Sequence, residues 1–252
     1  LSQQMIRSYA LTELKGMIDP NFQLIVESGH SATYVTPFFN SEFMGYACKK
    51  LDVGGKLLTN YLKESISFKY LDLSKDYRTV GSIKETLGFV SMDFKADIKK
   101  RGKHSKHYVL PDSEIKSRGY ATSEIDPKTF RGEKVTLDKE RFTIPEIIFS
   151  PSDIGLNEGG ISDSILQSLG KINADFLEVM LENVIISGGN THFPNFKERL
   201  FKELRPNAPD YMDPKITALN DLNAVYTGCY HYLSEDRNVS ELAIRKSHYE
   251  EK

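Results

Sequence analysis

The sequence predicts an α/β fold in which short apolar strands alternate with amphipathic helices. Residues 24–26 and 184–186 are apolar throughout, and each run ends near a Ser-Gly corner. Such runs suit strands in a sheet that is covered on both faces. Segments 58–66 and 196–204 repeat apolar residues at helical spacing. Because ligands collect at the carboxyl ends of strands in α/β sheets, the two corners are the first candidates for a binding site.

Length and composition narrow the class of protein. The chain has 252 residues, 39% of them apolar and 27% charged, with a formal net charge of −2. This length can bury a large core, as one domain or two. No apolar stretch approaches the roughly 18 residues that cross a bilayer, so we expect no membrane partner. The near-zero charge argues against wholesale nucleic-acid binding. Cys48 and Cys229 are far apart in apolar segments, and we expect reduced, buried thiols in an intracellular compartment.

The first third of the chain predicts a helix followed by strands. Its opening residues show helical spacing, with Leu1, Met5, Ile6, Tyr9 and Leu14 on one side. A start at Leu1, inside a helix, suggests a fragment of a longer polypeptide. A turn at 19–21 leads into a hairpin over 24–39, bent at Ser28-Gly29. A third strand over 46–53 runs into Gly54-Gly55 and the helix of 58–66.

The middle of the chain is less regular. Residues 68–80 are polar, and Ser82 with Glu85 fits a capping box that starts a helix. We expect a short strand end at 90–94, a basic solvated loop at 97–106, a strand at 108–112 and an exposed insertion over about 113–135.

The last third predicts helices around one buried strand. Ser162 and Asn173 suit the N-caps of two helices, and the strand 184–187 stops at Gly188-Gly189. Pro194 can open the next helix, which carries Phe196, Leu200, Phe201 and Leu204. An apolar, tyrosine-rich segment covers 220–233. A charged tail over 236–252 carries Ala243, Ile244 and Tyr249 as anchors.

Each candidate motif has a structural alternative. The corner after Glu27 leaves backbone N–H groups free for an anion, yet similar corners occur in hairpins that bind nothing. Gly54-Gly55 could admit a ligand or only permit a tight turn. Glu85 has a capping role available. His192 has no partner at metal-ligand spacing, which favours a surface or hydrogen-bonded histidine.

Taken in order, the motifs of this chain resemble the actin family, from about residue 18 to residue 252. Three further segments, 53–60, 108–112 and 151–155, together with the Tyr-Glu-Glu near the end, resemble a nuclear actin-related branch of that family. The succession is Glu-Ser-Gly at 27–29, Leu-Asp-x-x-Gly-x-x-Leu-Thr-x-Tyr-Leu at 51–62, Ile-Lys-Glu at 83–85, Asp-Phe at 93–94, Leu-Pro-Asp at 110–112, Glu-Arg-Phe-x-x-Pro-Glu at 140–146, Pro-Ser-x-x-Gly at 151–155 and Ser-Gly-Gly-x-x-x-x-Pro at 187–194.

The resemblance implies an actin-like fold of the actin, heat-shock and sugar-kinase ATPase superfamily, comprising the second lobe and the C-terminal part of the first. In that fold two lobes enclose ATP, and the first phosphate loop lies on the lobe that this chain lacks. The implied parts are the end of a first-lobe helix (1–17), a subdomain-3-like core (18–53 and 157–223), a subdomain-4-like part (54–156, with a long insertion at about 95–140) and a C-terminal subdomain-1-like segment (224–252).

The resemblance also implies a nucleotide site that is only partly kept. Glu27 stands where the family has Asp, so it could hold a hydrated Mg²⁺ indirectly, and ATP with Mg could bind as a structural ligand. His30 replaces a second Asp, Ser31 a Gly, and Tyr34 the His that organises the attacking water. Gly81 and Leu222 replace an Arg and a Lys, while Asn190, His192 and Phe193 stand at Thr, Met and Tyr positions. The implied nucleotide-binding residues are Glu27, Ser28, Gly29, His30, Gly55, Lys84, Glu85, Gly188, Gly189, Asn190 and Phe193.

Because several reactive groups are replaced together, we expect no catalytic residue and no fast ATP hydrolysis. The leading hypothesis is a non-catalytic scaffold subunit of a nuclear chromatin remodeler of the Swr/SRCAP type, which exchanges a core nucleosomal histone for its Z-type variant. The resemblance implies the remodeler's motor subunit, a zinc-HIT-type subunit and other subunits as partners, with nucleosome contact through 99–101 as a weaker expectation. The alternatives are a slowly hydrolysing, actin-like ATPase and a lone binding module.

Overall fold

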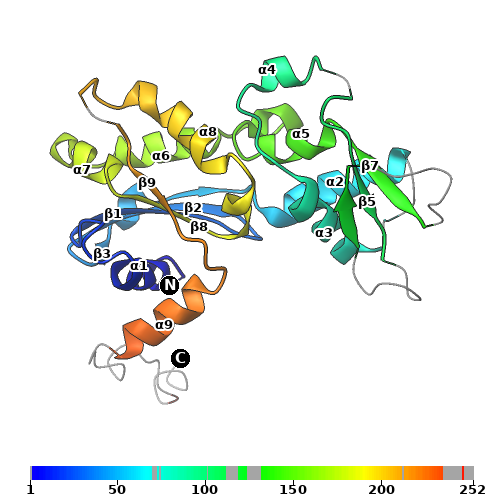
Figure 1. Ribbon diagram of the computed structural model, residues 1–252. Coiled ribbons are helices and arrows are strands. Elements are labelled where there is room, and N and C mark those ends of the chain that lie inside the picture. Colours follow the sequence, from blue (N-terminus) through cyan, green and yellow to red (C-terminus); the bar gives the residue numbers. More distant parts are fainter. Residues whose placement is uncertain are drawn as a thin grey trace.

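The fold consists of two α/β bodies that lie side by side (Figure 1). The computed structural model describes residues 2–69, 73, 75–100, 102–111, 119–123, 132–211, 213–234 and 246. The charged tail, with Ala243, Ile244 and Tyr249, lies outside the described residues apart from Lys246. Much of the predicted insertion and Arg101 of the basic loop also lie outside them.

The larger body is built on a sheet of six strands. Its order is β3-β2-β1-β8-β9, and β4 pairs with the free part of β2. The β1–β2 hairpin is antiparallel, whereas β8 runs parallel to both β1 and β9. The strands are β1 (Phe22–Ser28), β2 (Thr33–Phe39), β3 (Glu42–Phe43), β4 (Lys49–Leu51), β8 (Val184–Ser187) and β9 (Ile216–Ala218).

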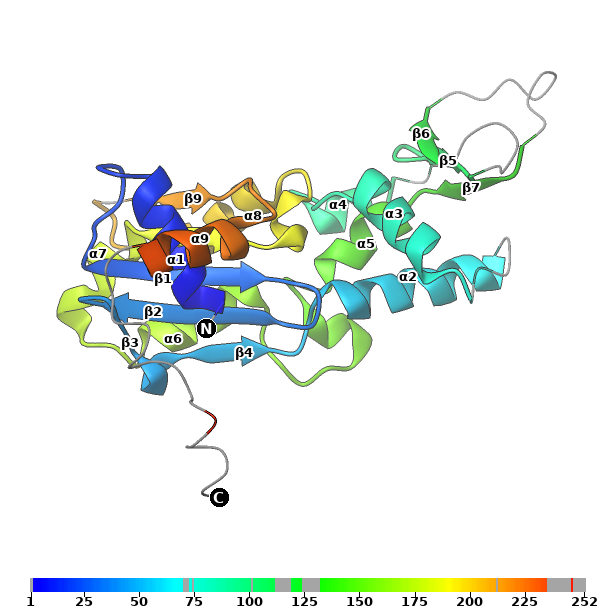
Figure 2. The ribbon, with the colours of Figure 1, turned by 90° about the horizontal axis from the view of Figure 1, so that it is seen from below.

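Helices cover both faces of this sheet, as the apolar strands predicted (Figure 1). Leu24 and Val26 pack with α6, α7 and α8, whereas Ile25 between them packs with α1 on the opposite face. This alternation follows from the two-residue period of a strand. Helix α9 lies against α1 (Figure 2). The helices are α1 (Ser2–Glu13), α6 (Ile161–Leu169), α7 (Leu177–Leu181), α8 (Phe196–Leu204) and α9 (Ala224–Ser234).

The smaller body joins helices to a three-stranded antiparallel sheet of order β6-β5-β7. The sheet lies at the far end of the molecule from α1 and α9 (Figure 2). Its elements are α2 (Gly55–Lys69), α3 (Tyr77–Leu87), α4 (Phe94–Asp97), β5 (Lys106–Val109), β6 (Tyr120–Thr122), β7 (Lys134–Leu137) and α5 (Glu140–Glu146).

Two predicted N-cap residues were wrong. Helix α3 begins before Ser82, because the Asp76 side chain caps it by accepting from the Thr79 N–H at 3.0 Å. Ser82 lies mid-helix and its hydroxyl bonds to that of Tyr108 at 2.7 Å. In α6 the N-cap is Gly160 instead of Ser162, which lies inside the helix. The Asp163 side chain, in the first turn, accepts from the Gly160 N–H at 3.2 Å. The Asn173 cap was predicted correctly, as its side chain accepts from the Asp175 N–H.

Several strand predictions also need correction. The strand expected over 46–53 is reduced to β4, because residues 45–47 form a 3₁₀ turn. Residues 90–93 form a loop leading into α4 instead of a strand. The insertion is not wholly irregular, since it contributes β6 and β7 to the small sheet. Helix α8 begins at Phe196, two residues after Pro194, and its Phe201 is 36% exposed.

Two general expectations were tested on the described residues. Cys48 and Cys229 are free thiols, and both are only half-buried. None of the described helices is long and apolar enough to cross a membrane.

Candidate functional site

The parallel pairing of β1 and β8 brings the two predicted corners together. Glu27 lies opposite Ser187 in the register, so the loops after both strands leave the sheet at the same edge. The loops touch closely: a Cβ on Gly188 would lie 2.3 Å from the Ser28 carbonyl oxygen, and Gly188 has φ +99°. Only glycine fits this backbone without strain. Gly188 therefore serves the packing of the two corners.

Asn190 fastens the corners to each other. Its amide donates to the Ser28 hydroxyl at 3.1 Å and to the Gly29 carbonyl at 2.9 Å. Ser28 is fully buried and also bonds to the Thr33 hydroxyl at 2.9 Å. These bonds satisfy buried polar groups from segments 160 residues apart in sequence. The site is consequently preorganised, with the second corner held on the first.

The paired glycines 54 and 55 have different roles. A Cβ on Gly54 would lie 2.6 Å from the backbone of Ser31 and Ala32, so this glycine permits the tight turn. Gly55 donates its N–H to the Gly29 carbonyl at 2.9 Å and begins α2. A Cβ on Gly55 would lie 3.3 Å from the Lys84 amine. It would therefore crowd the Lys84 side chain. The tight turn is confirmed at Gly54, and ligand approach at Gly55 stays a prediction.

A cavity of about 380 Å³ opens where these segments meet. Its volume lies in the range of about 300–1,000 Å³ that small-molecule sites occupy. Both bodies contribute, the larger through its corners and the smaller through α2 and α3. The lining residues are Gly29, His30, Gly55, Lys84, Glu85, Gly189, Asn190, His192, Phe193 and Leu222.

Lys84 is the buried cation of the cavity. Only 6% of the residue is exposed, and its amine donates to the Gly55 carbonyl at 3.2 Å. Burial lowers the pKa of Lys84, and the neighbouring carboxylate of Glu85 offsets this only in part. An ammonium group has three donors, so Lys84 can also donate to a ligand. Gly189 has no atom within 4 Å of its Cβ position, so its backbone is open to the cavity.

Glu27 lies outside this cavity lining. Its carboxylate accepts from the Ser2 hydroxyl at 2.9 Å and from the Gln3 amide at 2.5 Å, both on α1. The strand alternation explains this, because Glu27 shares the face of Ile25, which packs towards α1. Tyr34 lies opposite Glu27 in the hairpin and lines a separate cavity of about 210 Å³ with Gln3.

The predicted metal role of Glu27 has no further ligands around it. Among the described residues, no group of three or more His, Cys, Asp or Glu side chains could hold a metal ion. His192 is hydrogen-bonded, as expected, with its two ring nitrogens 3.3 Å from the Gly188 carbonyl and 3.2 Å from that of Asn220. The described donor set thus fits an uncharged or phosphate-bearing organic ligand better than a bare cation.

Most of the predicted site residues meet in the cavity, and three do not line it. Glu27, Ser28 and Gly188 lie next to it and build the corners. His192 and Leu222 line it without having been proposed as binding residues. His192 follows Asn190 in the same loop. Leu222 follows β9, and only the β8–β9 pairing places it here. The residues that line the cavity as predicted are Gly29, His30, Gly55, Lys84, Glu85, Gly189, Asn190 and Phe193.

The arrangement suits a flat organic group approached by backbone. The open backbone of Gly189, the side-chain amide of Asn190 and the buried ammonium of Lys84 surround the space. Phe193 and Leu222 add an aromatic and an aliphatic wall, and apolar walls with a few polar groups are typical of small-molecule sites. The fold and this cavity define a protein of the actin class. The family model described as Actin matches residues 10–252, and the chain belongs to the actin family.

Within the family, the similarity is to actin-related protein 6. The protein of that name from Arabidopsis thaliana is 32% identical over 256 residues, covering 90% of this chain and 61% of the relative. Its namesake from Dictyostelium discoideum is 32% identical over 289 residues, covering 90% and 59%. Actin-like protein arp6 from Aspergillus fumigatus is 34% identical over 257 residues, covering 90% and 55%. The chain thus spans between about half and two thirds of the length of these relatives.

Proposed function

We propose that this chain belongs to a non-catalytic, actin-related scaffold subunit that holds ATP as a structural ligand. The observation that carries the proposal is the separation of Glu27 from the cavity. The cavity keeps the glycines and the Lys84 that we expect beside a purine, whereas the Glu27 carboxylate bonds to Ser2 and Gln3 of α1. Hydrolysis needs a metal-bound or base-activated water beside the terminal phosphate. Replacement of the family's reactive side chains at His30 and Tyr34 supports the same reading.

A bound nucleotide would act by stabilising the assembled form. The cavity joins both bodies, so a ligand there binds the folded arrangement and not the unfolded chain. At about 100 times its dissociation constant, such a ligand adds about 2.7 kcal/mol of stability. ATP would then hold the two bodies together. We assign these bodies to subdomains 3 and 4 of the actin-like fold. Residues 1–17 and 224–252 would belong to the first lobe.

For the cellular role we propose a nuclear chromatin regulator, a subunit of a remodeler that exchanges a core nucleosomal histone for its Z-type variant. The similarity to actin-related protein 6 supports this assignment. The partners proposed are the remodeler's motor subunit, a zinc-HIT-type subunit and other remodeler subunits. The small sheet β6-β5-β7 is the candidate interface, because it lies away from the cavity and carries the 41% exposed Tyr120 (Figure 2). Nucleosome contact through Lys99 and Lys100 is a weaker part of the proposal.

The experiment that tests this proposal measures binding and turnover together. The purified chain is equilibrated with ATP and Mg²⁺, bound nucleotide is extracted and identified by mass, and phosphate release is followed. We expect ATP to be recovered intact and phosphate release to stay at the buffer rate. Phosphate release that disappears in Glu27→Gln would instead support the alternative, a slowly hydrolysing actin-like ATPase. For the remaining alternative, a lone binding module, the result would be sharp unfolding of the isolated chain and no co-purifying subunits.

A further inference from the structure

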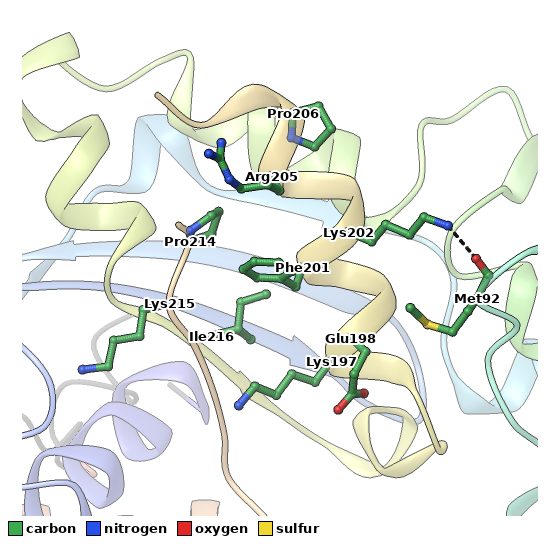
Figure 3. A pocket seen from close by; sticks show the side chains of 10 residues that line it. All are labelled: Met92, Lys197, Glu198, Phe201, Lys202, Arg205, Pro206, Pro214, Lys215 and Ile216. Atoms are coloured by element: carbon green, nitrogen blue, oxygen red, sulfur yellow. Dashed lines mark hydrogen bonds between the residues drawn. The ribbon is translucent and has the colours of Figure 1, made fainter. Parts of the chain in front are cut away.

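A second and larger hollow lies along α8 and shares no lining residue with the cavity around Lys84. It encloses about 770 Å³ between α8, the segment before and into β9, and Met92 (Figure 3). We call it the α8 groove. Its lining residues are Met92, Lys197, Glu198, Phe201, Lys202, Arg205, Pro206, Pro214, Lys215 and Ile216.

The α8 groove has an apolar floor on a helix face that should be polar. Helix α8 buries Phe196, Leu200 and Leu204 against the sheet, which completes its inward stripe. Phe201 lies at the edge of this stripe, centrally in the groove beside Ile216, and is 36% exposed (Figure 3). An aromatic ring that stays this exposed on an amphipathic helix gives only part of its surface to the core. Exposed apolar surface in a hollow with a polar rim is typical of interaction sites.

The rim of the groove is basic. Lys197, Lys202, Arg205 and Lys215 surround the floor, against the single carboxylate of Glu198 in the lining. This local excess of positive charge contrasts with the net charge of −2 of the whole chain.

The four cations of the rim differ in how far they are engaged. Arg205 is paired with Asp213 at 2.5 Å. The amines of Lys202 and Lys215 each donate to one backbone carbonyl, at 2.8 and 2.6 Å, and keep further donors. Lys197 is exposed, and none of the described residues accepts a hydrogen bond from its amine. Three lysines can therefore meet an anionic partner.

We propose that the α8 groove binds an acidic peptide segment of a partner protein, with an apolar side chain of that segment seated on Phe201. The charge of the rim selects carboxylates, and the floor offers a place for one leucine- or phenylalanine-sized anchor. Basic clusters around a hydrophobic floor recognise acidic motifs in this manner. This inference is independent of whether the other cavity holds ATP.

The floor and the rim argue for a peptide over nucleic acid. A nucleic-acid backbone is bound through many phosphate contacts along a broad basic surface. Here the centre is occupied by the apolar side chains of Phe201, Ile216, Pro206 and Pro214, which leave little room for a row of phosphate contacts. An acidic segment with an apolar anchor satisfies both parts of the groove, whereas a phosphate backbone satisfies only the rim.

The test uses the complete chain and a fluorescein-labelled synthetic peptide of Asp and Glu residues around a central Leu-Phe pair. Binding is followed by fluorescence anisotropy at about 0.15 M salt, where exposed charges more than about 8 Å apart are screened. We expect saturable binding. Phe201→Ser should weaken it about tenfold, as loss of a central anchor does. Lys197→Glu should weaken it about fivefold and make its salt dependence shallower, because one attractive charge contact is lost.

Controls separate this site from general charge attraction. Lys171→Glu makes the same charge change at another exposed lysine, whose amine contacts the Tyr46 carbonyl on the side of the sheet opposite β9, and it should leave the affinity within about twofold. A peptide with Asn and Gln in place of Asp and Glu should not bind. Melting curves check that each variant is folded, and Lys197→Glu is informative even if Phe201→Ser unfolds, because Lys197 is exposed.

Several results would overturn the inference. They are an absence of binding, equal binding of the uncharged peptide, and equal loss of affinity in Lys171→Glu and Lys197→Glu. A further contrary result would be that an equal concentration of duplex DNA displaces the peptide and that Phe201→Ser does not change the affinity. The groove would then bind phosphate through charge alone.

Discussion

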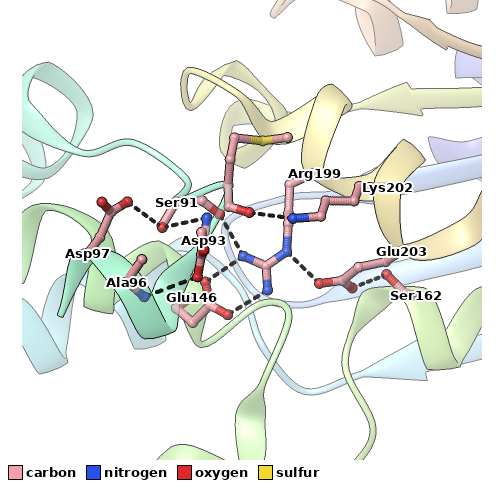
Figure 4. Close-up of polar contacts among 10 residues, drawn as sticks. Ser91, Asp93, Ala96, Asp97, Glu146, Ser162, Arg199, Lys202 and Glu203 are labelled. Atoms are coloured by element: carbon pink, nitrogen blue, oxygen red, sulfur yellow. Dashed lines mark hydrogen bonds and ion pairs between the residues drawn. The ribbon is translucent and has the colours of Figure 1, made fainter. Parts of the chain in front are cut away.

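The clearest prediction concerns the ion pair that joins the two bodies. Arg199 of α8 contacts the Glu146 carboxylate of α5 through two nitrogens, at 2.7 and 3.1 Å (Figure 4). It also donates to the Ser91 carbonyl at 2.6 Å and to Glu203 at 2.6 Å. The side chains of Arg199 and Glu146 are only 12% and 4% exposed. We therefore expect Arg199→Met to weaken the junction between the bodies severely.

The magnitude follows from the carboxylate left behind. Removing one partner of a buried pair costs about 3–5 kcal/mol, because the remaining charge stays desolvated. For a chain of this length, 1 kcal/mol corresponds to roughly 2–4 °C in melting temperature. Arg199→Met should therefore lower the melting temperature by roughly 6–20 °C. Glu203 keeps the Ser162 hydroxyl as a donor at 2.5 Å, so the loss is centred on Glu146.

The assay is thermal unfolding followed by circular dichroism, with hydrogen exchange over α5 and residues 88–93 to locate the loosening. Lys202→Met is the matched control, since it removes an exposed cation of the same helix that donates to one carbonyl. It should cost less than about 1 kcal/mol. The double variant Glu146→Leu/Arg199→Met should be more stable than Arg199→Met, because no unpaired charge remains. A melting temperature of Arg199→Met close to that of Lys202→Met would refute the reasoning.

The pH dependence of this junction has a definite sign. Burial raises the pKa of Glu146, although the bonds from Arg199 oppose the shift. For Arg199, burial acts against the charged form, but the bonds to Glu146 and Glu203 outweigh it and raise the pKa. In Arg199→Met the Glu146 pKa should rise further. A carboxyl group with a raised folded-state pKa favours folding when protonated and loses this contribution as pH rises through that pKa. The deficit of Arg199→Met should therefore shrink as the pH falls, and a deficit that grows would contradict this.

Three further predictions concern single residues. Gly188→Ala should destabilise by more than about 2 kcal/mol, because its φ is +99° and its Cβ would meet the Ser28 carbonyl oxygen; urea unfolding measures this, and a neutral result would show that the corners can separate. The hydrogen bond from Ser91, and after it that from His104, lowers the pKa of Asp97. The stabilisation by this carboxylate is present at neutral pH and is lost as pH falls, so wild type and Asp97→Asn should converge in melting temperature under acid. A constant difference between the two melting temperatures would argue against this. Lys84→Met should weaken binding of a fluorescent ATP analogue about tenfold without lowering the melting temperature of the free protein, because a desolvated ammonium is removed; unchanged affinity would place the ligand elsewhere.

The sequence by itself determined the buried strands, the helices with clear apolar spacing and the two glycine corners. These features are local: apolar runs, helical periods and glycines act through the chain's own backbone, and the motif order adds the family. The resemblance to that family also identified eight of the residues that line the cavity. Six of them follow β1, β4 or β8, whereas Lys84 and Glu85 lie on α3.

Only the tertiary structure decided where the side chains at these elements point and what they meet. Glu27 turns to α1 through the alternation of β1 and the packing of a helix that no local pattern places there. Asp76 takes the capping role expected of Ser82, whose hydroxyl bonds across to Tyr108. Phe201 shares the helical spacing of residues that α8 buries, yet it stays 36% exposed and lines a basic groove with Ile216 of β9. Such outcomes depend on contacts between segments far apart in the chain, and only folding brings those segments together.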